Sequence, residues 1–209
     1  MVINYSQTIN RHTELDAYPL PLIDELVRKI AENKVYSKID LKSAYHQIPI
    51  HMDDRKYTAF EANGNLYQFT RLSFGLTNAV AIFQRIMNST IRDNNLERTY
   101  AYLDDVIICG RDKTEHDKNL EKFMQVAREL NITLDHEKCL FSQNSITYLG
   151  YFISNGNLSP DTTRMNSLDN MPYPKDDASM KRMLGLFSYY SKWIKDYSEK
   201  IQPLLKNTF

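Results

Sequence analysis

The stretch Tyr102-Leu103-Asp104-Asp105, followed by the apolar run Val106-Ile107-Ile108-Cys109, decides the fold of this chain. Two adjacent carboxylates lie between segments rich in β-forming residues, a pattern that predicts a β-hairpin with acids at its tip. The four apolar residues after Asp105 indicate a strand buried on both faces. The turn is therefore expected in the middle of a sheet. The alternative is a solvated hairpin tip, because aspartate is common in turns.

The paired carboxylates at this tip indicate a metal site. Two neighbouring ionised acids repel each other, and burial raises that cost. A divalent cation removes both penalties, and Mg²⁺ is typically held by one or two carboxylates together with substrate phosphates. The pattern favours metal-assisted phosphoryl or nucleotidyl transfer.

A two-metal site needs a third carboxylate from elsewhere in the fold. Asp40 is the best candidate, because it ends the apolar-rich segment 35–39 and an acid at a strand end can face a cleft. The alternative for Asp40 is that its side chain caps the turn that follows.

Composition sets broad limits. The 209 residues suffice for one or two compact units, and 42% hydrophobic and 25% charged residues are ordinary for a globular protein. The formal net charge is zero, from 26 basic and 26 acidic residues, whereas nucleic-acid binders are usually basic. A binding groove needs only local positive charge, which Arg55, Lys56 and Arg71 could supply for template or phosphate. The alternative is that these are ordinary solvated basic side chains.

Two further features concern the environment of the chain. Cys109 and Cys139 lie in apolar, strand-like segments and are expected to be reduced core thiols. A signal peptide and a long apolar span are both missing from the sequence, so we expect an intracellular protein with no membrane partner.

Strand and helix patterns interleave along the chain, which predicts an α+β fold. Apolar spacing predicts helices over 23–30, 78–92 and 180–194, and a further helix through 120–130 with Thr114 as its N-cap. Asn63-Gly64 predicts a hairpin turn. The proline-rich stretch 160–177 predicts a boundary. Strands are expected at 35–39, 45–50, 132–134, 140–141 and 148–153.

Tyr102-Leu-Asp-Asp105 resembles the Tyr-x-Asp-Asp box of reverse transcriptases. Seven further segments resemble gypsy-type LTR retrotransposon polymerases in order and spacing, and together they span nearly the whole chain. They are Tyr18-Pro-Leu-Pro-Leu-Ile-Asp24, Ser37-Lys-Ile-Asp-Leu-Lys-Ser-Ala-Tyr-His-Gln-Ile48, Lys56-Tyr-Thr-Ala-Phe60, Phe74-Gly-Leu-Thr-Asn-Ala79, Phe83-Gln84, Tyr148-Leu-Gly-Tyr151 and Leu184-Gly-Leu-Phe-Ser-Tyr-Tyr190.

The resemblance implies a polymerase palm with an antiparallel sheet flanked by helices. Residues 1–160 would form the palm with partial fingers, and residues 161–209 the start of a thumb or connection. The implied reaction is RNA-directed DNA synthesis, which extends a primer 3′-hydroxyl with deoxynucleotides on an RNA or DNA template. Asp40, Asp104 and Asp105 would hold two Mg²⁺ ions, with Mn²⁺ as a possible substitute.

The resemblance also implies the surroundings of such a domain. It would belong to a retrotransposon Pol polyprotein that also carries RNase H and integrase. It would work in the cytoplasm, within a virus-like particle, or in the nucleus.

Other site residues follow from the same resemblance. The backbone of Leu41, Lys42, Ser43 and Ala44 would approach the incoming triphosphate. Tyr45 matches the aromatic gate that excludes a ribose 2′-hydroxyl by steric clash, with ordinary strand packing as its alternative.

Phe74 and Gly75 would line the nucleotide pocket, whereas on its own Phe74 reads as a core aromatic. Lys138 matches the lysine proposed in this family to protonate pyrophosphate, with a solvated lysine before a strand as its alternative. The primer grip would consist of Tyr148, Leu149, Gly150 and Tyr151. Its alternative is plain strand pairing, with Gly150 marking a bulge.

The sequence also departs from the family pattern. Ser73 and Val80 stand where similar enzymes usually have proline. The chain starts inside the fingers region and stops at Phe209, before a connection and RNase H, so a polyprotein fragment or a decayed genomic copy is expected. Two rival functions follow: a non-catalytic remnant that binds nucleic acid or protein, and an RNA-copying RNA polymerase.

Overall fold

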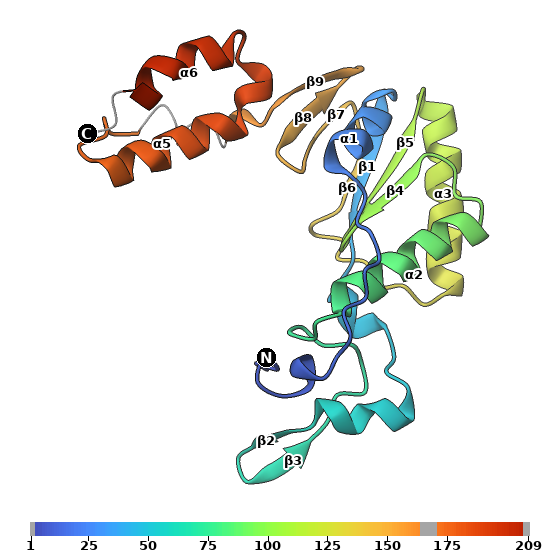
Figure 1. Ribbon diagram of the computed structural model, residues 1–209. Helices are drawn as coiled ribbons and strands as arrows, with labels where there is room; N and C mark the ends of the chain where they lie inside the picture. The colour runs from blue at the N-terminus through green and yellow to red at the C-terminus, as the bar shows by residue number, and fades with distance from the viewer. Residues whose placement is uncertain (1–2, 164–170, 207–209) are drawn as a thin grey trace.

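The computed structural model describes residues 3–163 and 171–206. Its centre is a four-stranded antiparallel sheet with the strand order β4-β5-β1-β6 (Figure 1). The strands are β1 (Val35–Asp40), β4 (Thr99–Tyr102), β5 (Asp105–Gly110) and β6 (Leu140–Gln143). Val106, Ile107, Ile108 and Cys109 are fully buried in β5, between β4 and β1. The predicted buried strand after Asp105 is confirmed, whereas β4, the other strand of the hairpin, lies at the edge of the sheet.

The two faces of this sheet have different covers. One face packs on α2 (Ala79–Asp93) and α3 (Lys113–Glu129), in a core that includes Ile39, Val106, Phe83 and Phe123. The other face packs on α1 (Ile23–Ala31) and a second antiparallel sheet. That sheet is made of β7 (Ser145–Tyr148), β8 (Tyr151–Ser154) and β9 (Asn157–Pro160).

Side-chain alternation decides which face carries the acids. Successive residues of a strand point to opposite faces. Tyr36 and Ile107 belong to the core beside α1 and the second sheet, so Asp40 and Asp105 share their face. The antiparallel sheets and the helices packed on them confirm the predicted α+β organisation.

Two groups of smaller elements lie beside the sheets (Figure 1). Beyond the end of the central sheet that carries Asp40 lie the 3₁₀ helices η1 (Ile9–Arg11), η2 (Ala44–Gln47) and η3 (Met52–Thr58), with the hairpin β2 (Phe60–Ala62) and β3 (Asn65–Tyr67). Beside the second sheet lie α5 (Asp177–Tyr189), η4 (Ser191–Trp193) and α6 (Tyr197–Lys206). Part of the predicted boundary at 160–177 lies outside the described residues.

Several local predictions were wrong. Residues 45–50 form no strand, because Ser43 adopts a left-handed conformation (φ 49°) and the chain then closes 3₁₀ hydrogen bonds. Residues 132–134 contribute only an isolated bridge from Leu134 to Leu41. Helix α3 is capped by Asp112, whose carboxylate accepts from the Glu115 N–H at 2.8 Å, and not by Thr114.

Other predictions are confirmed. The Asn63-Gly64 turn joins β2 to β3 with positive φ at both residues, as a type I′ turn requires. Cys109 and Cys139 are free, buried thiols. In the part of the chain that the structure describes, no helix combines the length and apolar composition needed to cross a bilayer.

A buried polar chain ties α3 to the central sheet. The Ser37 hydroxyl lies 2.8 Å from His116 Nε2, and His116 Nδ1 lies 2.9 Å from Asp117 Oδ1. The Ser142 N–H of β6 donates to the same hydroxyl at 3.0 Å. Ser37 and His116 are both inaccessible to solvent, so this hydroxyl–imidazole–carboxylate chain fastens elements together and has no access to a substrate.

Gly110 should be irreplaceable by alanine, because a Cβ there would lie 2.3 Å from the backbone nitrogen of His116. We expect Gly110→Ala to lower the free energy of unfolding by about 2 kcal/mol or more, through displacement of α3. Gly185→Ala is the control, since a Cβ added at this position inside α5 would meet nothing within 4 Å. It should raise stability by about 0.5–1 kcal/mol. Urea unfolding gives the free energy of unfolding of both variants. Equal effects of the two substitutions would contradict the packing argument.

Candidate active site

The three candidate carboxylates lie at the ends of neighbouring strands. Asp40 ends β1 and is paired directly with Asp105, the first residue of β5. Asp104 is exposed in the two-residue turn between β4 and β5. The Leu41 N–H donates to the Asp104 carbonyl at 3.2 Å. The predicted meeting of Asp40 with the acid pair is therefore present in the structure.

The turn itself has an unusual backbone. Leu103 has φ 56°, a left-handed conformation that costs energy for a residue with a branched side chain. Its N–H donates at 2.9 Å to Oε1 of Gln84, a fully buried residue of α2. The Gln84 amide nitrogen donates in turn to the Ala101 carbonyl at 2.9 Å. Gln84 thus holds both sides of the acid-bearing turn.

Two lysines balance the charge of the site. Lys38 Nζ lies 3.2 Å from Asp105 Oδ1, and Lys138 Nζ lies 3.9 Å from Asp40 Oδ1 and 3.0 Å from Asp135 Oδ2. Burial raises the pKa of Asp105 above its usual value, Lys38 opposes that rise, and Asp104 and Asp40 add to it. The hydrogen bond to Asp135 raises the pKa of Lys138, so its ammonium is charged at neutral pH.

The alternatives for the acids can now be judged. In the described part of the chain, the neighbour of the Asp40 carboxylate is the Lys138 ammonium, and no turn N–H donates to it. Asp104 does lie at a solvated tip, whereas the Asp105 side chain is only 24% exposed. The solvated-tip alternative therefore describes one acid of the pair and not the other.

The donor chemistry fits a hard divalent cation, because carboxylate oxygens are the ligands that Mg²⁺ and Mn²⁺ prefer. Within residues 3–163 and 171–206, however, no three His, Cys, Asp or Glu side chains converge on a ready-made metal position. Lysines already neutralise two of the acids. The carboxylates are thus neighbours that would have to draw together around an ion.

The residues after Asp40 divide into buried and exposed positions. Leu41 and Ala44 are buried in the core, while Lys42 and Ser43 are exposed. A side-chain amide closes this segment: Gln47 Nε2 donates to the Lys42 and Thr133 carbonyls at 2.7 and 2.8 Å. The segment Leu41–Ala44 therefore presents polar backbone and small side chains next to Asp40.

Tyr45 lies on η2 and faces two other rings. Its ring contacts those of Phe74 and Phe83 edge-to-face, with centroid distances of 5.0 and 5.3 Å. The strand-packing alternative for Tyr45 was wrong, since no strand forms there. The core alternative for Phe74 was also wrong, because its side chain is 42% exposed.

Gly75 follows Phe74 in a conformation that requires glycine. Its φ is 93°, and a Cβ would lie 2.5 Å from the Ile3 carbonyl oxygen. The Asn10 amide donates to the Gly75 carbonyl at 2.7 Å. Gly75 thus lets the N-terminal segment pack beside the Phe74 loop.

The segment matching the primer grip is a tight hairpin. Tyr148 of β7 pairs with Tyr151 of β8, and both Leu149 (φ 51°) and Gly150 (φ 84°) have positive φ. The register is regular on both sides, so the alternative in which Gly150 marks a bulge was wrong. Tyr148 is buried, and its ring lies 5.8 Å from Lys38 Nζ.

Tyr151 connects this hairpin to the C-terminal helices. Its hydroxyl hydrogen-bonds with the Asp24 carboxylate and with the Lys192 ammonium. Lys192 Nζ also lies 3.0 Å from Asp24 Oδ1 and 4.2 Å from the Tyr151 ring centre. These groups surround a cavity of about 660 Å³ that Tyr102 and Leu149 also line.

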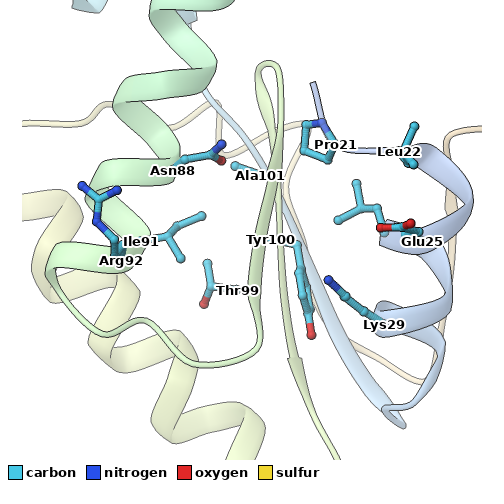
Figure 2. Close-up of a pocket in the computed structure, with 11 residues that line it drawn as sticks. Pro21, Leu22, Glu25, Lys29, Asn88, Ile91, Arg92, Thr99, Tyr100 and Ala101 are labelled. Carbon is cyan, nitrogen blue, oxygen red and sulfur yellow. The ribbon is translucent and has the colours of Figure 1, made fainter. Parts of the chain in front are cut away.

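A second cavity, of about 400 Å³, lies between α1 and α2 beside Thr99–Ala101 of β4 (Figure 2). Helix α1 and the residue before it contribute Leu22, Glu25 and Lys29 to one side, and α2 contributes Asn88, Ile91 and Arg92 to the other. Its walls carry no carboxylate cluster, so it is no rival to the site at Asp40 and Asp105.

Sequence reasoning missed the roles of Gln84 and Lys38. Gln84 had one available signal: it is a polar residue within the buried apolar stripe of α2, next to Phe83 and before Met87. Lys38 had none, because its partner Asp105 is brought to it only by strand pairing.

Comparisons with known proteins show the family of the chain. The family model described as "Reverse transcriptase (RNA-dependent DNA polymerase)" matches residues 3–153. The Retrovirus-related Pol polyprotein from transposon gypsy of Drosophila melanogaster is 33% identical over 204 residues, which cover 98% of this chain and 20% of the relative. That from transposon 412 of the same species is 35% identical over 209 residues, 99% of this chain and 17% of the relative.

Solved structures of foamy viral protease-reverse transcriptases also match the chain. A foamy viral protease-reverse transcriptase in complex with double-stranded DNA matches with a TM-score of 0.89 and 25% identity, over 99% of this chain and 36% of that one. The foamy viral protein in complex with an RNA/DNA hybrid matches with a TM-score of 0.80 and 25% identity, over 99% of this chain and 28% of that one.

The antiparallel sheet with its covering helices is the fold of a reverse transcriptase domain. The chain belongs to the reverse transcriptase (RNA-dependent DNA polymerase) family, as its match over residues 3–153 shows. It is homologous to the Pol polyproteins of gypsy-type retrotransposons and spans about a fifth of the length of these relatives.

Gln84→Ala tests whether the acid-bearing turn depends on its buried clamp. The change leaves the Leu103 N–H and the Ala101 carbonyl without their partner, so we expect a loss of about 1–3 kcal/mol of unfolding free energy. Gln125→Ala on α3 is the control, because its amide only reaches the exposed Glu129. Chemical unfolding measures both, and a Gln84 effect no larger than the Gln125 effect would rule out the clamp.

Proposed function

We propose that this chain catalyses RNA-directed DNA synthesis, in which a primer 3′-hydroxyl attacks the α-phosphate of a deoxynucleoside triphosphate and pyrophosphate leaves. The observation that carries the proposal is the register that sets Asp40 opposite Asp105, with Asp104 in the adjoining turn. The substrates would be a primed RNA or DNA template and deoxynucleotides. The same chain would work within a Pol polyprotein, beside RNase H and integrase, inside the cell.

Asp40, Asp104 and Asp105 would hold two Mg²⁺ ions, or Mn²⁺ in their place. Bound there, the ions supply Lewis acidity at the attacking and leaving oxygens. The protein contributes position and charge, which dominate catalysis of phosphoryl transfer. Lys138 is charged and lies next to Asp40, where it could donate a proton to the leaving pyrophosphate.

The nucleotide would lie between Asp40 and the aromatic cluster. The exposed backbone at Lys42 and Ser43 would contact its triphosphate, together with Leu41 and Ala44 of the same turn. The Tyr45 ring is fixed by Phe74 and Phe83, so it cannot swing away from an added 2′-hydroxyl. Phe74 and Gly75 would complete the pocket on the template side.

The subdomain assignment is part of the same proposal. Residues 1–160 would form the palm with partial fingers, including β2 and β3. Residues 161–209 would begin the thumb or connection. The Tyr148–Tyr151 hairpin would support the primer end, since it faces the same side of the central sheet as Asp40 and Asp105.

Primer extension on an RNA template with Mg²⁺ and deoxynucleotides tests the activity. We expect extension by the parent and a loss of about a thousandfold or more in the Asp104→Asn, Asp105→Asn double variant, because charge stabilisation at the reacting oxygens is removed. The matched control is Asp53→Asn, Asp54→Asn, which alters another adjacent acid pair, exposed on η3. No extension by a folded parent would favour the non-catalytic remnant.

Tyr45→Ala tests the gate and separates the enzyme from an RNA polymerase. The parent should strongly prefer deoxynucleotides, and the variant should incorporate ribonucleotides at least about tenfold more readily relative to them. Tyr57→Ala, at an exposed tyrosine on η3, should leave the preference unchanged. A parent that prefers ribonucleotides would identify an RNA-copying RNA polymerase instead.

A further inference from the structure

Lys38 occupies a position that the proposed reaction does not use. It lies on β1 two residues before Asp40 and faces the same side of the sheet. Its Nζ is 3.2 Å from Asp105 Oδ1 and 5.8 Å from the centre of the Tyr148 ring. Its side chain is 26% exposed, so the charge is partly withdrawn from water. Lys38 therefore lies between a candidate metal ligand and the first residue of the Tyr148–Tyr151 hairpin.

The surroundings of Lys38 are negative. Asp40 pairs with Asp105 across β1 and β5, and Asp104 precedes Asp105 in the turn, so three carboxylates lie at one end of the sheet. The Tyr148 hydroxyl is buried and makes no hydrogen bond among the described residues. Burial, with Asp105 adding to it, raises the pKa of Tyr148 far above its usual value. A tyrosine is either neutral or negative, so Tyr148 cannot balance the acids.

Lys138 is a weaker counter-charge for the acids than Lys38. Its side chain is 66% exposed, and its nearest carboxylate is Asp135 at 3.0 Å, with Asp40 farther away at 3.9 Å. Exposed ion pairs of this kind contribute little. Lys38 is the ammonium that directly contacts an acid of the Tyr102–Asp105 turn.

We propose that Lys38 is a positioning residue that acts as the resident cation of the carboxylate site. It neutralises Asp105 while no metal ion is bound and must give up that contact when a divalent cation arrives. A lysine suits this exchange, because it is a compact point charge on a flexible stem. The inference rests on the proposed function, since it assigns Asp105 to a metal ion.

Lys38 should then affect two properties in opposite directions. Without metal, its loss leaves Asp105 half-buried beside two other acids, so the protein should become less stable. With metal, its loss removes a positive charge that competes for Asp105, so the ion should bind more tightly. A purely structural lysine would lower stability without tightening metal binding.

The stability half is tested by urea unfolding of the full chain at pH 8 with EDTA. Lys38→Met should shift the midpoint to lower urea, and the same change in an Asp105→Asn background should shift it much less. Lys113→Met, which removes an exposed lysine paired with Asp117 away from the site, is the matched control. Equal effects of Lys38→Met in both backgrounds would overturn the pairing.

The metal half is tested by Mn²⁺ titration of the same proteins, followed by electron paramagnetic resonance of free Mn²⁺. We expect about tenfold tighter binding by Lys38→Met, and binding within twofold of the parent for Lys38→Arg and Lys113→Met. Unchanged or weaker binding by Lys38→Met, with a parent that binds, would overturn the inference and leave the proposed function standing. Binding by Lys38→Met alone would support it. No binding by either would overturn both.

Discussion

The pairing of β1 with β5 sets Asp40 opposite Asp105 and Lys38 beside Asp105, and the carboxylate site depends on that register. A shift of one residue would turn Asp40 toward α2 and α3 and bring Ile39 to the face that packs on α1 and the second sheet. The buried side chains prevent this, because Ile39 and Val106 on one face and Tyr36 and Ile107 on the other fill separate cores. The apolar packing of the sheet therefore fixes the geometry of its most polar end.

Placing three acids together creates an electrostatic cost that the rest of the site offsets. Lys38 approaches Asp105, and Lys138 approaches Asp40. Gln84 accepts a hydrogen bond from the Leu103 N–H and so holds the strained turn between β4 and β5. None of this needs a basic protein, because the compensating charges are local. The zero net charge of the chain is thus compatible with a site that handles phosphates and nucleic acid.

Much of this architecture could be predicted from the sequence. The apolar run after Asp105 predicted the central strand because a strand buried on both faces has no polar alternation. Asn63-Gly64 predicted its hairpin because only certain residues adopt positive φ at both turn positions. The acids were found as candidates because they end or begin strands with apolar neighbours.

The failures came from contacts between distant parts of the chain. Residues 45–50 look like a strand locally, but after the left-handed Ser43 the chain forms a 3₁₀ helix over Ala44–Gln47, and the Gln47 side chain bonds to Thr133. From its local sequence Phe74 looks like a core residue. In the structure the next residue, Gly75, packs its backbone on Ile3, and the Phe74 side chain stays partly exposed. Lys38 had no signal, because its importance arises only when strand pairing brings Asp105 beside it.

Strand β5 is hydrogen-bonded on both sides, and four of its residues are closed to solvent. Amide hydrogens in such a strand exchange with water only when the sheet opens as a whole. Those of a peripheral hairpin such as β2–β3 exchange through local fraying. The carboxylates at its end are therefore attached to the slowest-exchanging part of the molecule. Local opening of the β2–β3 hairpin or of the C-terminal helices would therefore leave the pairing of Asp40 with Asp105 unchanged.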